Sequence, residues 1–210
     1  MAHLVLLGDS IFDNGAYTGA GPAVIAQVRK RIPVGWRATL CAVDGASIMD
    51  VGAQLPKVPR DAERLVLSIG GNDVLRHAEL LERAVTTGAE AIDLIGEAAR
   101  GFEAAYHDML HPCLQIDRHM VICTIYSGNF PDPAYQRVVN VALAPFNDAI
   151  IRLGLEHGLT IVDLRSVCNA PADYANPIEP SSIGGAKIAR AIVRAAMGDW
   201  SEAPVARIIG

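Results

Sequence analysis

The stretch LVLLGDSIFDN, residues 4–14, decides how this chain is organised. Its first four residues form a short apolar run, which is typical of a buried strand. The run stops at Gly8, Asp9 and Ser10, which suit a turn because glycine adopts unusual dihedral angles and short polar side chains bond to nearby backbone. Ser10 is therefore either an ordinary turn residue or a nucleophile displayed at the edge of a sheet.

Similar short apolar runs recur along the chain and alternate with helical patterns. Each run stops at Gly, Asp, Asn or Ser, and together they predict five strands, at residues 4–7, 38–43, 65–69, 120–125 and 160–162. Apolar residues at helical spacing predict helices at residues 23–31, 92–110 before Pro112, 146–157 and 183–197. A further short helix is expected to run from Asp73, as its capping residue, through Leu80.

Strands separated by helices favour a mostly parallel sheet joined by right-handed crossovers. The predicted fold class is α/β, a three-layer α/β/α sandwich of flavodoxin-like type with a five-stranded sheet. The 210 residues are 51% hydrophobic, enough to bury a full core, and no stretch has the composition of an interdomain linker. We therefore expect residues 1–210 to form one domain.

Charge and composition argue against several classes of partner. The net charge of -5 gives no basic footprint for nucleic acid. No signal peptide is recognised, and no apolar run reaches the roughly 18 residues of a membrane helix, so we expect no transmembrane segment and a cytoplasmic location. The four cysteines are widely spread, with no repeated metal-ligand spacing, which predicts buried free thiols.

Ligands of open parallel sheets bind beyond the carboxyl ends of the strands. Those ends carry Ser10, then Gly45, then Asn72 in GGND, so all three are expected on one rim. A serine hydroxyl, an approachable backbone amide and an asparagine amide are parts of an acyl-transfer site. Each also has an ordinary reading, as a turn or cap serine, a turn glycine and a loop-tying asparagine.

The sequence GDSIFDN, then VDGAS, then GGND, in that order, resembles the SGNH (GDSL) hydrolase superfamily. EPSSIGGAKIA, residues 179–189, resembles that family's last block, so the likeness covers nearly the whole chain. The resemblance implies a serine nucleophile at Ser10 and an oxyanion hole made by the backbone N–H groups of Ser10 and Gly45 with the side-chain amide of Asn72. It also implies a carboxylic ester hydrolase of esterase or lipase type that acts on a small-molecule ester without metal or cofactor.

The chain departs from the family pattern at the catalytic base. The usual block reads Asp, two residues, then His and Pro, whereas this chain has Asn176 and Glu179 at those two positions. We predict that Glu179 is the general base, that apolar neighbours raise its pKa, and that the Asn176 amide donates a hydrogen bond to orient it. The alternative is an acid at a helix N-terminus with no catalytic part.

Other assignments stay open at the level of sequence. His77 is a weaker candidate base, because it lies little more than one helical turn after Asn72. His107 and His111 have a spacing that could hold a metal, but no third ligand is evident, so ordinary helix residues are favoured. Without a histidine the protein could instead be a binding or scaffolding protein, or an acyltransferase that uses the same serine.

Overall fold

Five parallel strands form the centre of the molecule. The computed structural model describes residues 2–116 and 118–199. The sheet order is β2-β1-β3-β4-β5, and every neighbouring pair is parallel. The strands are β1 Ala2–Gly8, β2 Trp36–Leu40, β3 Arg64–Ser68, β4 His119–Cys123 and β5 Thr160–Val162. The α/β fold class and the five predicted strands are thus confirmed.

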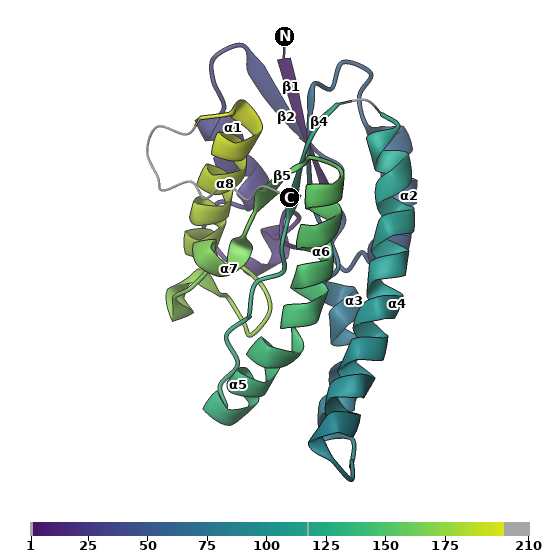
Figure 1. Cartoon of the computed structure of the whole chain (residues 1–210). Helices are drawn as coiled ribbons and strands as arrows, with labels where there is room; N and C mark the ends of the chain where they lie inside the picture. The colour runs from purple at the N-terminus through teal and green to yellow at the C-terminus, as the bar shows by residue number, and fades with distance from the viewer. Residues whose placement is uncertain (1, 117, 200–210) are drawn as a thin grey trace.

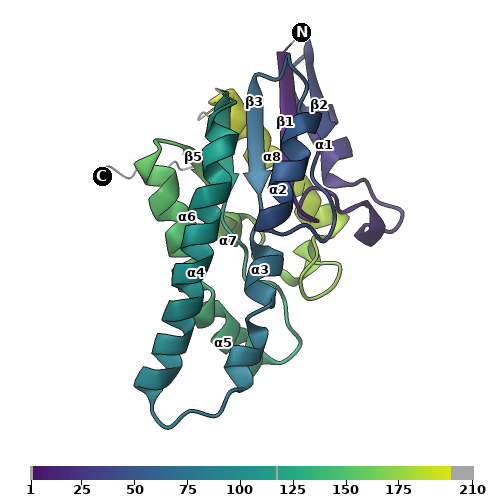
Figure 2. The same ribbon diagram turned by 90° about the vertical axis from the view of Figure 1, so that its right-hand side faces the viewer.

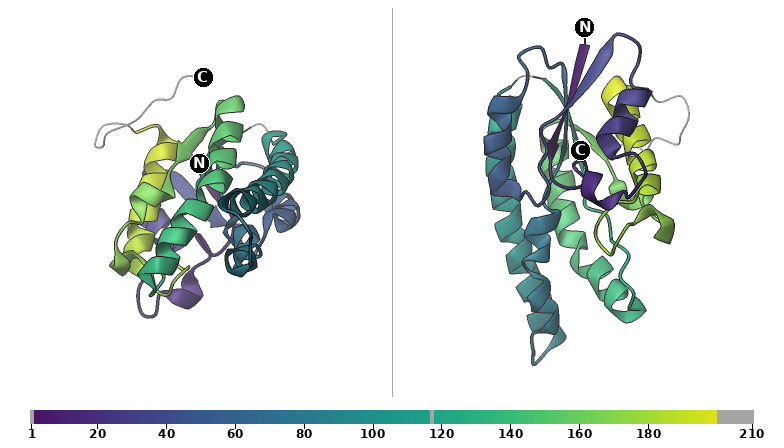
Figure 3. Two further views of the ribbon diagram at one scale, coloured as in Figure 1. Left: turned by 60° about the horizontal axis from the view of Figure 1, so that its bottom comes forward. Right: turned by 180° about the vertical axis from the view of Figure 1, so that it is seen from behind.

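Helices cover both faces of this sheet and make three layers (Figure 1). On one face lie α1 and α8; on the other lie α2, α4 and α6, as the view from behind in Figure 3 also shows. These five helices are α1 Val24–Arg31, α2 Val51–Gln54, α4 Gly88–Leu114, α6 Ala144–Glu156 and α8 Ser182–Met197. A short helix, α7 Leu164–Val167, follows β5.

The residues of β1 explain why this strand lies inside the sheet. Leu4 and Leu6 belong to the core under α1 and α8, whereas Val5 and Leu7 belong to the core under α2, α4 and α6. A strand covered on both faces needs apolar side chains in both directions, which is why the run shows no alternation. The four cysteines are buried and free, as predicted.

The helical segments beyond the strand ends differ from the predictions. The expected helix from Asp73 to Leu80 is wrong, since α3 covers only Gly71–Leu75 and a separate 3-10 helix, η4, covers Ala78–Glu82. Helix α5, Pro133–Ala142, has no counterpart among the predicted helices. Helix α4 runs past Pro112 and ends two residues later at Leu114, although a proline removes one backbone donor of the helix. Figure 2 shows α3, α4 and α5 extending beyond the carboxyl-end edge of the sheet.

Helices α5 and α6 together form a stretch that is long and apolar enough to be tested as a transmembrane segment. The 24 residues Pro133–Glu156 could cross a membrane by length and composition alone. The α6 part packs in the core through Phe146, Ile150 and Leu153, so its apolar character has a structural reason there. One such stretch is weak evidence, and the absence of a transmembrane segment stays a prediction.

Candidate active site

The turn after β1 places Ser10 at the carboxyl end of the sheet. Gly8 has φ +125, and a Cβ atom there would lie 1.8 Å from the Ser68 carbonyl oxygen, so only glycine fits. The side chain of Gln54 forms two hydrogen bonds with the backbone of Gly8. Its Oε1 accepts from the Gly8 N–H, and its Nε2 donates to the Gly8 carbonyl, both at 2.8 Å. The sheet and one buried side chain therefore fix the position of Ser10.

Glu179 meets Ser10 although 169 residues separate them in the chain. Ser10 Oγ donates a hydrogen bond to Glu179 Oε1 at 3.1 Å, and both side chains are buried. Burial raises the pKa of Glu179 to about 7, against the lowering effect of the Ser10 hydrogen bond, and the Asp44 carboxylate adds to the rise. Near neutral pH this carboxyl group can therefore both accept and release a proton.

The segment before Glu179 holds it differently from the prediction. Asn176 Oδ1 accepts from the backbone N–H groups of Ile178 and Glu179, at 3.0 and 2.9 Å. The predicted bond from the Asn176 amide to the Glu179 carboxylate is wrong: within residues 2–116 and 118–199 that amide donates to no carboxylate, and Glu179 Oε2 has no partner. Asn176 shapes the backbone turn and thereby sets the direction of the glutamate side chain.

Glu179 also lies outside the helix that follows it. Ser181 caps α8, since its Oγ accepts from the N–H groups of Ile183 and Gly184. The Glu179 carboxylate is directed to Ser10 and makes no bond to the helix amides. The alternative of an acid that only serves the helix N-terminus is therefore disfavoured by geometry.

A buried aspartate anchors the loop that carries Glu179. Asp173 Oδ2 accepts from the N–H groups of Asn169 and Ala170, both at 3.0 Å, and forms a 2.7 Å ion pair with Lys187 Nζ on α8. Its backbone carbonyl accepts from the Ser181 N–H at 2.8 Å. Sequence reasoning missed this residue, because a single loop aspartate carries no pattern that predicts burial.

Of the three expected oxyanion donors, Ser10 and Asn72 line the same cavity and Gly45 does not. Asn72 Nδ2 donates to the Ala46 carbonyl at 2.8 Å, so it ties the loop as the ordinary reading expected, and one amide hydrogen is left over. Among the described residues, the backbone N–H groups of Ser10 and Gly45 have no acceptor. Gly45 has φ +77 and lies exposed, outside the cavity that Ser10, Asn72 and Glu179 line together.

Asp73, next to Asn72, braces the same loop. Its Oδ2 accepts from the Ile48 N–H at 3.0 Å, which links α3 to the segment after β2. Burial raises the pKa of Asp73. Asp73 thus joins α3 to the segment that begins at Ile48, and the predicted capping of a longer helix is not observed.

Asp9 is a second carboxyl group in this cavity that sequence reasoning overlooked. Its side chain is 3% exposed, and Oδ1 accepts from the Ile11 N–H. Burial raises the pKa of Asp9 to about 8, and the nearby charge of Glu179 contributes to this rise. Burial therefore raises the pKa of both carboxyl groups that line this cavity, and each favours its neutral form more than a solvent-exposed carboxyl group would.

None of the six histidines lines the cavity that contains Ser10. The His77 ring stacks on Phe146, with 6.2 Å between the ring centroids, and lines the neighbouring cavity. His3 is buried at the opposite end of β1, between Asp61 and Thr39. The part of the chain that the structure describes has no cluster of three or more His, Cys, Asp or Glu side chains suited to a metal ion.

Comparisons with known proteins give a matching family and similar folds. The model of the GDSL-like lipase/acylhydrolase family matches residues 6–184. Among curated proteins no significant match is found.

Similar solved structures include three ester hydrolases. An extracellular lipase from Streptomyces rimosus has a TM-score of 0.68 at 18% identity, over 94% of this chain and 99% of that one. A phospholipase A1 from Streptomyces albidoflavus has a TM-score of 0.61 at 17% identity, over 93% and 98%. An acetyl xylan esterase variant from Geobacillus stearothermophilus has a TM-score of 0.61 at 20% identity, over 92% of this chain and 94% of that one. At these identities the likeness shows the fold.

Proposed function

Because the chain is an ester hydrolase that belongs to the GDSL-like lipase/acylhydrolase family, we propose that Ser10 is its nucleophile and Glu179 its general base. The observation that carries this proposal is the 3.1 Å hydrogen bond from Ser10 Oγ to Glu179 Oε1 in a buried cavity. A nucleophile within hydrogen-bond reach of a base is the arrangement that activates a serine hydroxyl.

A glutamate can do this work only if its basicity is raised. An ordinary glutamate has a pKa about two units below that of histidine, so as a base it begins roughly 3 kcal/mol worse. Burial supports the assignment, since it raises the pKa of Glu179 to about 7, where a general base is most effective at neutral pH. Asp9, protonated under the same conditions, adds no second negative charge beside the nucleophile.

The proposed reaction passes through an acyl-enzyme. Glu179 takes the proton of Ser10 Oγ as that oxygen bonds to the ester carbonyl carbon and the C=O electron pair moves onto its oxygen. The N–H groups of Ser10 and Gly45 and the remaining amide hydrogen of Asn72 stabilise this oxyanion, each by about 3 kcal/mol. Glu179 then gives the proton to the alcohol oxygen as the ester C–O bond breaks. In the second half it removes a proton from the water that attacks the acyl carbon, and it returns this proton to Ser10 Oγ as the acid is released.

A fluorophosphonate probe tests the nucleophile directly. Intact-mass measurement is expected to give one added probe on the wild-type protein and none on Ser10→Ala. Hydrolysis of 4-nitrophenyl acetate should fall at least about a thousandfold in the same variant, with an unchanged melting temperature. The exposed Ser166 gives the matched control, and Ser166→Ala should label fully.

The same experiment separates the competing functions. A wild-type protein that stays unlabelled and does not hydrolyse the ester would favour a binding or scaffolding protein on this fold. Labelling with transfer of the acetyl group to an added alcohol, in preference to water, would favour an acyltransferase.

A further inference from the structure

The cavity at Ser10 is the first of three apolar cavities in a row. This inner cavity has a volume of about 90 Å³, a middle cavity follows with about 60 Å³, and an outer groove has about 780 Å³. The inner and middle cavities share Val74, Leu75, Phe130, Val139 and Leu143 as lining residues. The middle cavity and the outer groove share Leu81, Ile95 and Ala142. Shared lining residues place the three cavities side by side, and we refer to them together as the channel.

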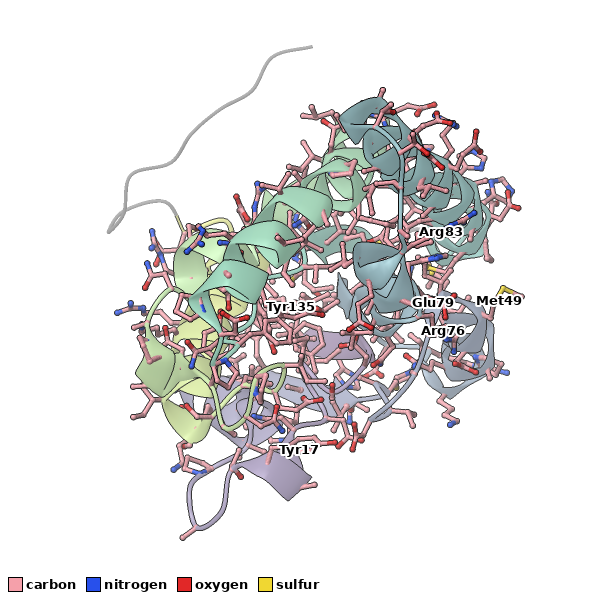
Figure 4. The ribbon with its side chains drawn as sticks, turned by 90° about the horizontal axis from the view of Figure 1, so that it is seen from below. Tyr17, Met49, Arg76, Glu79, Arg83 and Tyr135 are labelled. Carbon is pink, nitrogen blue, oxygen red and sulfur yellow. The ribbon has the colours of Figure 1, made fainter. Side chains whose placement is uncertain are left out.

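The channel lies between elements that extend beyond the sheet. Its walls come from α3, η4, the first half of α4, α5 and the start of α6. In Figure 2, α3 and α4 lie in front and α5 lies behind them. Figure 4 looks onto this end from below, with Tyr135 of α5 near the middle and Arg83, which follows η4, beside the groove. Near Ser10 the channel is narrow, and it widens where it reaches solvent.

The lining side chains leave apolar surface without a protein partner. Helix α5 has no buried residue, although Val138 and Val141 belong to the groove wall, and Val141 is 75% exposed. Ile92 on the facing side of α4 is also 75% exposed. Contiguous exposed apolar surface of this kind marks a binding groove.

The charges along the channel narrow down its occupant. In the inner and middle cavities the only acidic lining residues are Asp9 and Glu179, both at the Ser10 end. Arg83 and Arg137 lie only at the outer groove. An occupant that starts at Ser10 therefore has a reactive polar group at one end and a long apolar tail.

We propose that this channel holds the acyl chain of the substrate and that the enzyme prefers esters of medium-to-long-chain fatty acids. The inference rests on the proposed role of Ser10. The acyl group stays attached to Ser10 while the alcohol leaves and water enters, so the enclosed path suits the acyl chain. The alcohol departs outside the channel, where Gly45 is exposed and no atom lies within 4 Å of a Cβ built there.

A series of 4-nitrophenyl esters from acetate to laurate, kept below micelle formation, tests the proposal. The value of kcat/KM is expected to rise along the series, by up to roughly fourfold for each methylene that enters the channel. A matched series of acetate esters with lengthening alcohols should show no such rise. A rise in the alcohol series alone, or no rise in either, would overturn the acyl assignment.

Ala142→Phe narrows the junction of the middle cavity and the outer groove. The laurate-to-acetate ratio of kcat/KM should fall at least about tenfold in this variant, whereas Ala104→Phe, on the exposed side of α4, should keep the wild-type ratio. Val141→Glu, at an exposed position that cannot disturb the core, should lower the ratio in the same direction. A ratio unchanged in both channel variants contradicts the proposal.

Binding of laurate to Ser10→Ala separates this proposal from the proposed chemistry. Laurate should bind more tightly than octanoate, and Ala142→Phe on the Ser10→Ala background should weaken the binding of laurate. Binding of this kind without any hydrolysis by the wild-type protein would support the channel and remove the serine mechanism. Acetate hydrolysis without laurate binding would support the mechanism and remove the channel.

Discussion

The nucleophile and its proposed base are held by two different kinds of structure. Ser10 follows strand β1, which pairs with β2 and β3, and the close approach of the Ser68 backbone to Gly8 restricts the conformation of the turn. Glu179 lies in an irregular loop whose one described β-bridge joins Tyr174 to Pro180, and side chains hold it, above all Asp173 and Asn176.

This difference has consequences for how each half of the site can fail. The position of Ser10 is part of the sheet, so it is lost only when the fold is lost. The position of Glu179 depends on a short loop held by backbone bonds, such as that from the Ala175 N–H to the Glu179 carbonyl, and by polar side chains that can be changed while the sheet remains intact. We therefore expect substitutions in the loop to reduce turnover more than stability.

The largest effect is expected from Glu179→Gln, which keeps the shape of the base and removes its basicity. Turnover of a short ester should fall by roughly 10²–10⁴, the usual contribution of general base catalysis. The wild-type kcat/KM should rise with pH through about 7, as Glu179 ionises, and the variant should lose this rise. Glu156→Gln, at an exposed position, is the control. An unaltered rate and pH profile in Glu179→Gln would disprove the carboxylate base.

On the nucleophile side, Asn72→Ala should lower kcat by roughly a hundredfold through the loss of one oxyanion donor. The variant also loses the bond to the Ala46 carbonyl, so its melting temperature must be measured in parallel. A change in KM alone would make Asn72 a substrate-binding residue and would contradict the oxyanion assignment.

Asp173→Asn tests whether side chains hold the base. Loss of the charge that pairs with Lys187 should cost about 2 kcal/mol of unfolding free energy, less than for a fully buried pair because Lys187 is partly solvent-exposed. We expect kcat to fall about tenfold as the Glu179 loop loosens. The exposed Asp108 provides the control Asp108→Asn. Full activity at reduced stability would mean that Asp173 supports the fold without positioning the base.

The last expected effect is on stability, not on turnover: the unfolding free energy should depend on pH. Burial raises the pKa of Glu179 from 4.5 to about 7 and that of Asp9 from 3.8 to about 8. The folded state therefore retains protons that the unfolded state has lost, and the unfolding free energy should fall as pH rises from about 4 to about 8. The Glu179 part alone amounts to about 3 kcal/mol at most.

Denaturant unfolding at a series of pH values measures this slope. Glu179→Gln and Asp9→Asn should each flatten it, because an amide does not titrate in this range. Equal slopes in the wild-type protein and both variants would show that neither carboxyl group is protonated in the folded state at neutral pH.

The strands and the Ser10 rim could be predicted because their signals are local. Uninterrupted apolar runs that stop at turn residues identify β1, β3 and β4, and the connection rules for parallel strands then bring their ends to one edge. Helix α5 was missed although it carries local signals, since Asp132 caps it and Pro133 stands at its first position. The break between α3 and η4 has no clear sequence signal.

The sequence by itself determined the strand order along the chain, the polar residues at the strand ends and the glutamate at the position of the usual histidine. Only the tertiary structure decided that Glu179 reaches Ser10, that Asn176 bonds to backbone and not to the glutamate, and that Asp9 is buried beside them. The physical reason is the distance along the chain over which each kind of interaction acts. Turn and strand preferences act over a few residues, whereas burial and the pKa values that depend on it arise from atoms that packing brings together from distant parts of the chain.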